Sequence, residues 1–371
     1  MLLPPISPFG SFSERSRRRG CAPRSRPSTS PRPTSCRQSI SRLPSSCPAP
    51  GRAPPGREGE GDQEAHEARR QAAFCIAFGV ALLLGGLAAT ATSAPKATVT
   101  ISLGTKDFTE EFVLGQLYKQ ALEAKGIKVD YHENIGSTEI IQTALRSGKI
   151  NAYPEYVGEI VQTAYHKTTG LPKTAHGWWA LGKSLLAKDG YVLSNATPFY
   201  DVDAIAVRKS DAAKYHLKTL YDLQKLQNSS NKPGNFTIGA RPEFKNREEG
   251  FLGMQHVYGL TKLNYVSIAN GLTYQALDQK KVFCINVFST DAQLATGKYT
   301  VLTDPKLIFG VQNVAVIVKK NVATPQVLGI LNAVSAKLTL PAILAMNKAT
   351  QTNKQNPAKV AKQFLQANGL L

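Results

Sequence analysis

Strand-like and helix-like segments alternate from residue 97 onward, and this alternation constrains the fold more than any other feature of the chain. The β-branched, alternating residues of ATVTISLGT are typical of a strand, and the next segment carries apolar residues at helical spacing. In order, the pattern predicts a strand at 97–105, a helix at 106–126, a strand at 127–133, a helix at 137–148 and a strand from 150. Such an order favours an α/β fold with parallel strands.

The ends of the two predicted helices carry recognisable signals. Asp107 followed by Glu110 resembles a capping box, and Ser137 or Thr138 is a typical N-cap for the second helix. A glycine, which tolerates the backbone conformation needed after a helix, closes each of them at 126 and 148.

The third strand runs into INAYPEYVGEIVQ, in which Tyr153 and Tyr156 flank a Pro-Glu pair. Proline fixes φ and removes a hydrogen-bond donor, so we predict a rigid aromatic and acidic corner here, and no central strand through Pro154. Later strand-like segments such as FTIGARPEF and VFCINVF predict a second sheet, and hence two lobes. Ligands of open α/β sheets bind beyond the carboxyl ends of the strands, which points to the loops GTKDFTEE, NIGSTE and YPEYVGE.

The first 94 residues have a different character. Residues 1–66 form an Arg-, Pro- and Ser-rich extension whose composition predicts disorder, and a start codon assigned too early is an alternative explanation for it. A positive pair, an apolar stretch at 72–89 and the A-x-A site of residues 89–91 then predict a signal peptide over 67–94. We therefore expect an exported, periplasmic or cell-surface protein, although 72–89 is also long enough for an uncleaved anchor.

Charge and cysteine content exclude several classes of function. The formal net charge is +19, of which residues 1–70 contribute +7, but the later lysines are scattered and form no basic stripe. We expect no nucleic-acid partner, and no membrane contact beyond the signal or anchor segment. The cysteine spacings match no zinc or redox motif, and Cys284 in the apolar run VFCINVF is predicted to be a buried packing thiol. No metal or other cofactor is indicated.

Four motifs in order carry a family resemblance: GTKDFTEEFVLGQLY, GSTEIIQTALRSGKINAYPEYVG, ARPEFKNREEGFLGMQHVYGL and VFSTDAQL. Over about residues 97–365 the chain resembles the substrate-binding proteins of ABC importers for glycine betaine, choline, carnitine and related quaternary amines. The resemblance implies a two-lobed, type II periplasmic-binding-protein fold with the ligand in a cleft between the lobes. It places lobe 1 at 97–202 plus 307–371 and lobe 2 at 203–306.

The resemblance also implies ligand-binding residues. Aromatic faces attract a desolvated methylated cation with about 2 kcal/mol or more per good contact, and basic side chains hold a ligand carboxylate. Tyr156 matches a tyrosine of the family's aromatic cage, while Lys106 and Arg247 match basic residues that hold the carboxylate.

Four further positions depart from the family pattern. Glu159 stands at a common threonine, Asp203 at a tyrosine for which Tyr200 is a substitute, Phe288 at another tyrosine, and Gln312 where the family has Pro and Tyr. Because these changes add carboxylates, Asp203 and Glu159 are predicted to be able to pair with a ligand ammonium. An amino-acid-like zwitterion with a free ammonium is therefore an alternative to a betaine- or choline-like solute.

The sequence favours a monomeric solute receptor that delivers its ligand to an ABC permease and its ATPase, without catalysis of its own. An enzyme on the same fold would need a nucleophile and a base within reach of each other, and all six histidines lie outside the candidate cleft loops. A membrane-anchored sensor domain is the remaining alternative.

Overall fold

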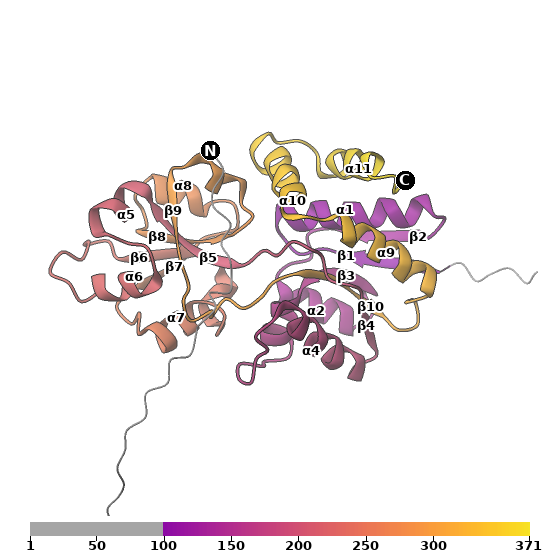
Figure 1. Ribbon diagram of the computed structural model, residues 1–371, viewed down its shortest axis with the longest axis horizontal. Coiled ribbons are helices and arrows are strands. Elements are labelled where there is room, and N and C mark those ends of the chain that lie inside the picture. The colour runs from indigo at the N-terminus through magenta and orange to yellow at the C-terminus, as the bar shows by residue number, and fades with distance from the viewer. Residues whose placement is uncertain (1–98) are drawn as a thin grey trace, which may run out of the picture. The chain divides into compact units, whose positions relative to one another are not determined.

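The computed structural model describes residues 99–371 of the 371-residue chain. The predicted extension at 1–66 and the predicted signal peptide at 67–94 lie outside the described residues. The described part is a mixed α/β fold with two five-stranded sheets (Figure 1). We call the elements around the first sheet the first lobe and those around the second sheet the second lobe.

The first sheet has the strand order β2-β1-β3-β10-β4. Its strands are β1 (Thr100–Gly104), β2 (Lys128–His132), β3 (Ala152–Tyr156), β4 (Tyr191–Leu193) and β10 (Val314–Lys319). The second sheet repeats the arrangement with the order β7-β6-β8-β5-β9. Its strands are β5 (Asp203–Arg208), β6 (Thr237–Ala240), β7 (Asn264–Ser267), β8 (Cys284–Phe288) and β9 (Tyr299–Leu302). The chain crosses between the sheets after β4 and again after β9 (Figure 1).

Neither sheet is all-parallel, so the predicted parallel arrangement is only partly right. Strands β2 and β3 both pair in parallel with β1, whereas β10 is antiparallel to its neighbours β3 and β4. In the second sheet β5 is likewise antiparallel to its neighbours β8 and β9. Each antiparallel strand is the first strand after a crossover. Asp203 at the start of β5 pairs with Phe288 at the end of β8, and Val314 at the start of β10 pairs with Tyr156 at the end of β3. The first strand after each crossover therefore starts beside the end of a neighbouring strand: β5 beside the end of β8, and β10 beside the end of β3.

The prediction that no central strand passes through Pro154 is wrong. Pro154 lies inside β3, opposite Val316 of β10. On its other edge β3 pairs with β1 only at Ala152, so Pro154 has no ladder bond to β1 to lose. A missing N–H is tolerated at such an unpaired edge.

Helices cover the sheets of both lobes. In the first lobe they are α1 (Thr109–Ala124), α2 (Thr138–Arg146), α3 (Val157–Glu159), the π-helical η1 (Ile160–Ala164), α4 (Ala175–Lys188), α9 (Pro325–Lys337), α10 (Leu340–Asn347), the π-helical η4 (Lys348–Thr352) and α11 (Pro357–Ala367). In the second lobe they are α5 (Lys209–Tyr215), α6 (Leu220–Leu226), the 3₁₀-helical η2 (Pro242–Asn246), α7 (Phe251–Tyr258), α8 (Thr273–Asp278) and the 3₁₀-helical η3 (Ala292–Thr296).

The helix-end predictions are partly confirmed. Gly126 and Gly148 have φ of 76° and 81°, the left-handed conformation expected after each helix. The capping box is wrong, because α1 has Phe108 at its N-cap and no side-chain cap. Ser137 is the N-cap of α2, but its hydroxyl donates to the Glu139 carboxylate instead of capping the helix.

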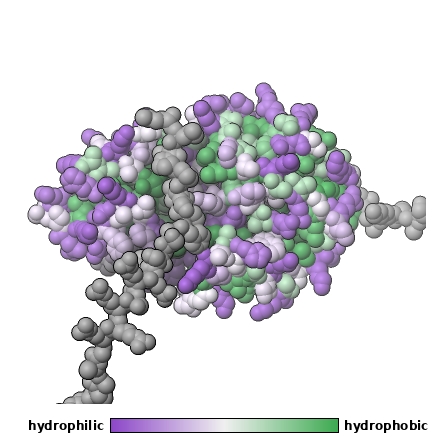
Figure 2. Space-filling model, in the orientation of Figure 1, coloured by the Kyte–Doolittle hydropathy of each residue, from purple (hydrophilic) through white to green (hydrophobic). Residues whose placement is uncertain are grey.

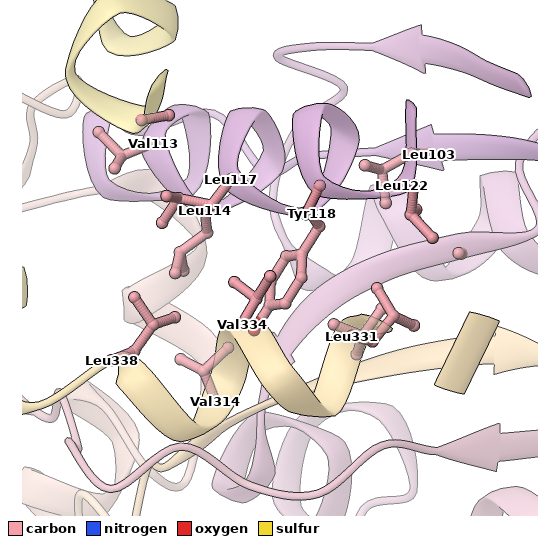
Figure 3. Packing of buried hydrophobic residues seen from close by; sticks show 14 of the residues in the cluster. Leu103, Val113, Leu114, Leu117, Tyr118, Leu122, Val314, Leu331, Val334 and Leu338 are labelled. Atoms are coloured by element: carbon pink, nitrogen blue, oxygen red, sulfur yellow. The ribbon is translucent and has the colours of Figure 1, made fainter. Parts of the chain in front are cut away.

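The core of the first lobe lies between α1 and the C-terminal helices. Leu114, Leu117 and Tyr118 of α1 face Leu331 and Val334 of α9, and each of these side chains is at most 1% exposed (Figure 3). Burying each such leucine stabilises the fold by about 2 kcal/mol. The residues after β10 thus complete the core that the first helix begins.

The predicted packing role of Cys284 is confirmed, because the side chain is fully buried in β8. Hydrophilic residues are spread over the visible face of the molecule, in keeping with the scattered lysines (Figure 2). Within residues 99–371 no single helix meets the length and hydropathy of a membrane span; only α9 with the segment 340–352, bent by 84°, does so as a pair.

Candidate ligand-binding site

A small cavity of about 30 Å³ lies between the two sheets and is lined by residues of both lobes. Its lining is Lys106, Asp107, Phe108, Ser137, Thr138, Tyr156, Glu159, Asp201, Asp203, Arg241, Glu243, Arg247, Asn270, Phe288 and Gln312. A volume of this size holds about two water molecules, so an organic solute requires the lobes to separate or the lining to move.

A wider hollow of about 710 Å³ adjoins this inner cavity. The two share Asp107, Ser137, Glu243, Arg247 and Asn270, so the hollow is the approach to the inner cavity. We refer to them as the inner cavity and the outer hollow.

Three aromatic rings form one wall of the inner cavity. Phe108 and Tyr156 belong to the first lobe, with ring centroids 6.0 Å apart. Phe288, at the end of β8 in the second lobe, stacks on Phe108 with centroids 4.9 Å apart and an interplanar angle of 23°. The wall is therefore continuous only when the two lobes meet.

Lys106 is anchored inside the first lobe. Its Nζ lies 2.5 Å from Oε1 of Glu155 and 4.3 Å from the centroid of the Tyr156 ring. Burial by itself lowers the pKa of Lys106, but the carboxylates of Glu155, Glu111 and Glu159 outweigh it, so the pKa is raised. The ammonium is charged and already has a carboxylate partner.

Arg241 and Asp203 form a buried pair in the second lobe. Nη1 and Nη2 of Arg241 donate to the two Asp203 oxygens at 2.6 and 2.8 Å, and Nε lies 2.9 Å from Glu243. Asn286 also donates to Asp203, at 2.8 Å. Although burial raises the pKa of Asp203, the nearby Arg241 lowers it by more. Arg241 in turn lies 4.8 Å from the centroid of the Phe288 ring.

Arg247 connects the two lobes where the inner cavity meets the outer hollow. From the second lobe, its Nε and Nη2 each donate to Glu139 of α2 at 2.9 Å, and Nη1 lies 3.0 Å from Glu159 of α3. Burial raises the pKa of Glu139, but Arg247 overrides this effect and brings it to about 2. Beside this pair, Thr163 of the first lobe donates to Glu249 of the second.

Behind the aromatic wall lies a buried carboxyl group, Glu110, which is 2% exposed. It accepts hydrogen bonds from the Tyr156 hydroxyl at 2.7 Å, from Thr290 of the second lobe at 2.6 Å and from Asn347 of α10 at 2.6 Å. Burial raises the pKa of Glu110, and these three hydrogen bonds oppose the rise only in part. Asp201 of the first crossover accepts from Thr290 N at 3.0 Å, which extends the network.

Gln312 of the second crossover packs against the acidic corner. Its Oε1 accepts from the Glu159 N–H at 3.2 Å, and its amide group lies so close to Gly158 that a Cβ there would be 2.6 Å away. Gly158 is therefore needed for this contact. Among residues 99–371 no group of three or more His, Cys, Asp or Glu residues is arranged to hold a metal ion.

Seven of the eight candidate residues from the sequence line the inner cavity: Lys106, Tyr156, Glu159, Asp203, Arg247, Phe288 and Gln312. Tyr200 does not, because it is 41% exposed and its backbone bridges Asn313. Sequence reasoning missed Phe108, Asp201 and Arg241. Phe108 and Arg241 stand in the quoted motifs GTKDF and ARPEF directly after strands, so a stricter use of the strand-end rule would have found them.

Two α/β lobes joined by two crossovers, with a polar and aromatic cavity between them, form the type II periplasmic-binding-protein fold. The chain belongs to the family described as the substrate binding domain of the ABC-type glycine betaine transport system, whose model matches residues 99–367. Members of this family are extracytoplasmic solute-binding proteins that work with an ABC permease and ATPase.

Among similar curated proteins is the glycine-betaine-binding protein of Pseudomonas aeruginosa, 29% identical over 279 residues, which cover 73% of this chain and 89% of that protein. The ergothioneine transport permease/ergothioneine binding protein of Helicobacter pylori is 29% identical over 272 residues, 72% of this chain, and the chain spans only 47% of that longer protein. The solved apo structure of YehZ from Escherichia coli is similar in fold, with a TM-score of 0.54, 24% identity, and coverage of 74% of this chain and 100% of that one.

Proposed function

We propose that the protein is an extracytoplasmic receptor that binds a small methylated ammonium solute in the inner cavity, closes its lobes around it and delivers it to an ABC permease. The observation that carries this proposal is the wall of Phe108, Tyr156 and Phe288, built from both lobes. A methylated cation has no N–H to donate, and aromatic faces are the surface that holds it best. Since Phe288 comes from the other lobe, lobe closure and completion of the wall are one event.

The alternative of an amino-acid-like zwitterion with a free ammonium finds less support. Asp203, the carboxylate expected to receive such an ammonium, already accepts from Arg241 through both oxygens and from Asn286. Glu159 pairs with Arg247. An ammonium would have to compete with guanidinium groups for both acceptors.

We assign lobe 1 to 97–202 plus 307–371 and lobe 2 to 203–306, and we take the protein to be a monomer with a signal segment at 67–94. N-terminal sequencing of the secreted protein tests the signal segment, and light scattering after gel filtration tests the monomer.

Calorimetric titration of the purified protein with choline, glycine betaine, carnitine and a set of amino acids tests the central claim. We expect heat and thermal stabilisation with at least one methylated ammonium compound. Heat with amino acids alone would favour the alternative, and no response to any of these solutes would overturn the proposed function.

A further inference from the structure

The charges around the inner cavity restrict which methylated solute fits. We propose that the preferred ligand is a cation without a carboxylate, an ammonium alcohol for which choline is the simplest probe, and that zwitterions such as glycine betaine bind more weakly. This inference rests on the proposed function, because it selects within the class of solutes assigned there.

Every basic side chain that lines the inner cavity already has carboxylate partners in the protein. Lys106 pairs with Glu155, Arg241 with Asp203 and Glu243, and Arg247 with Glu139 and Glu159. Three bases thus face five carboxylates. The side chains of Lys106, Arg241 and Arg247 are each at most 6% exposed. Their partners Glu155, Asp203 and Glu159 are at most 7% exposed, so these three pairs are little screened by water, whereas Glu139 is 46% exposed.

This acidic surplus is local, because the chain as a whole is basic, with a formal net charge of +19. A ligand carboxylate would be a sixth acid around three bases, and each of these bases is already paired with a carboxylate of the protein. To bind Arg247 it would have to displace Glu139 or Glu159. Displacing Glu159, which is 7% exposed, strands a buried charged group and weakens binding by more than about tenfold, whereas Glu139 is 46% exposed and is displaced at a smaller cost.

A cation meets the opposite conditions. The rings of the aromatic wall already attract protein cations, because the Lys106 ammonium lies 4.3 Å from the Tyr156 centroid and the Arg241 guanidinium 4.8 Å from that of Phe288. The uncompensated carboxylates around the wall lower the electrostatic potential at the cavity. The hydroxyl of a choline-like ligand is neutral, so it needs neither a free base nor the exchange of an ion pair. The arrangement therefore favours a ligand with a single positive charge and disfavours a ligand that also carries a negative charge.

Choline and glycine betaine form a matched pair of probes, because they share the trimethylammonium group and differ in a terminal CH₂OH or COO⁻. We expect calorimetric titration of the purified full-length protein to give a Kd for choline at least about tenfold below that for glycine betaine. Equal or tighter binding of glycine betaine overturns this inference and leaves the proposed function standing. If neither compound, nor carnitine, nor any amino acid binds, the proposed function itself fails.

A substitution tests the physical reason for the preference. Glu139→Gln removes one of the carboxylates that hold Arg247, so the affinity for glycine betaine relative to choline should rise at least about fivefold. Glu123→Gln is the control, because Glu123 pairs with Lys119 on the surface of α1 and does not line the cavity. A ratio that stays the same in Glu139→Gln, or changes equally in the control, contradicts the role given to the committed bases.

Discussion

The hydroxyl of Tyr156 donates to the buried Glu110 carboxyl at 2.7 Å, and the same carboxyl accepts from Thr290 of the opposite lobe at 2.6 Å. One acidic side chain therefore holds an aromatic ring of the cavity wall and also touches the lobe that must close over it. Substitutions at Tyr156 can measure the contribution of the ring and that of its hydroxyl separately.

Tyr156→Ala should raise the Kd for the best methylated ammonium ligand roughly 30-fold, because one cation–π contact contributes about 2 kcal/mol. Tyr156→Phe keeps the ring, so the Kd should change by less than about fivefold, while the free energy of unfolding falls by about 1 kcal/mol through loss of the bond to Glu110. Calorimetry and urea unfolding measure the two effects. Unchanged affinity in Tyr156→Ala would refute the aromatic wall as the cation site.

The Arg241–Asp203 pair should matter more for stability than any surface pair. Arg241→Met leaves Asp203 buried without its cation, and the free energy of unfolding should fall by about 3 to 5 kcal/mol. Removing both charges, as Arg241→Met with Asp203→Asn, should recover a large part of this loss. Lys119→Met breaks an exposed pair and should cost about 0 to 1 kcal/mol. Urea unfolding measures these changes. An equal fall in the free energy of unfolding for Arg241→Met and Lys119→Met would mean that the buried pair does not stabilise the fold more than a surface pair.

Arg247 should keep the lobes together. Arg247→Ala removes the ion pairs to Glu139 and Glu159, so the radius of gyration of the ligand-free protein from small-angle X-ray scattering should increase. Arg208→Ala is the matched control, because Arg208 pairs with Asp211 within the second lobe. Equal radii for wild type and Arg247→Ala would show that other contacts hold the lobes.

Glu249 should make stability depend on pH near neutrality. Burial first, and then the charge of Glu159, raise its pKa from 4.5 to about 7. The folded state binds this proton more tightly than the unfolded chain, so the contribution is complete below pH 4.5 and is lost as the pH rises through 7. The slope attributable to this group is at most about 1.4 kcal/mol per pH unit.

Glu249→Gln should keep an acceptor for Thr163 and remove this part of the pH dependence. The measurement is the difference in unfolding free energy between wild type and variant at pH 5.5 and 7.5. Wild type should lose stability relative to Glu249→Gln as the pH rises. A constant difference would show that Glu249 does not titrate in this range, and Glu123→Gln should show no such trend.

Periodicity predicted the strands and helices of residues 99–148 within a few positions, because α1 and α2 carry apolar residues at helical spacing and are followed by glycines. It could not predict the direction of β10, since that strand is set by where the chain returns from the second lobe. The prediction for Pro154 was wrong because it, too, depends on a neighbouring strand. Its tolerance depends on how far β1 extends along β3, a property of the neighbouring strand.

The site residues divide in a similar way. Motifs in register with the family located Tyr156, Phe288 and Arg247 at the inner cavity. Their partners could not be predicted, because Arg247 binds Glu139, which is 108 positions away, and Arg241 binds Asp203, which is 38 positions away. Only the folded chain brings these charges together, and they change the interpretation of Asp203 from a free acceptor to a member of an ion pair.

The position of β10 has a consequence for how the protein is made. This strand lies between β3 and β4, yet it is the last strand in the chain. As the polypeptide emerges from the ribosome, the second sheet has all of its strands by Leu302, whereas the first remains in two pieces until Val314–Lys319 appears. The first lobe therefore begins to be synthesised first, but its sheet is completed last. A chain that stops before residue 314 could assemble only the second sheet in full.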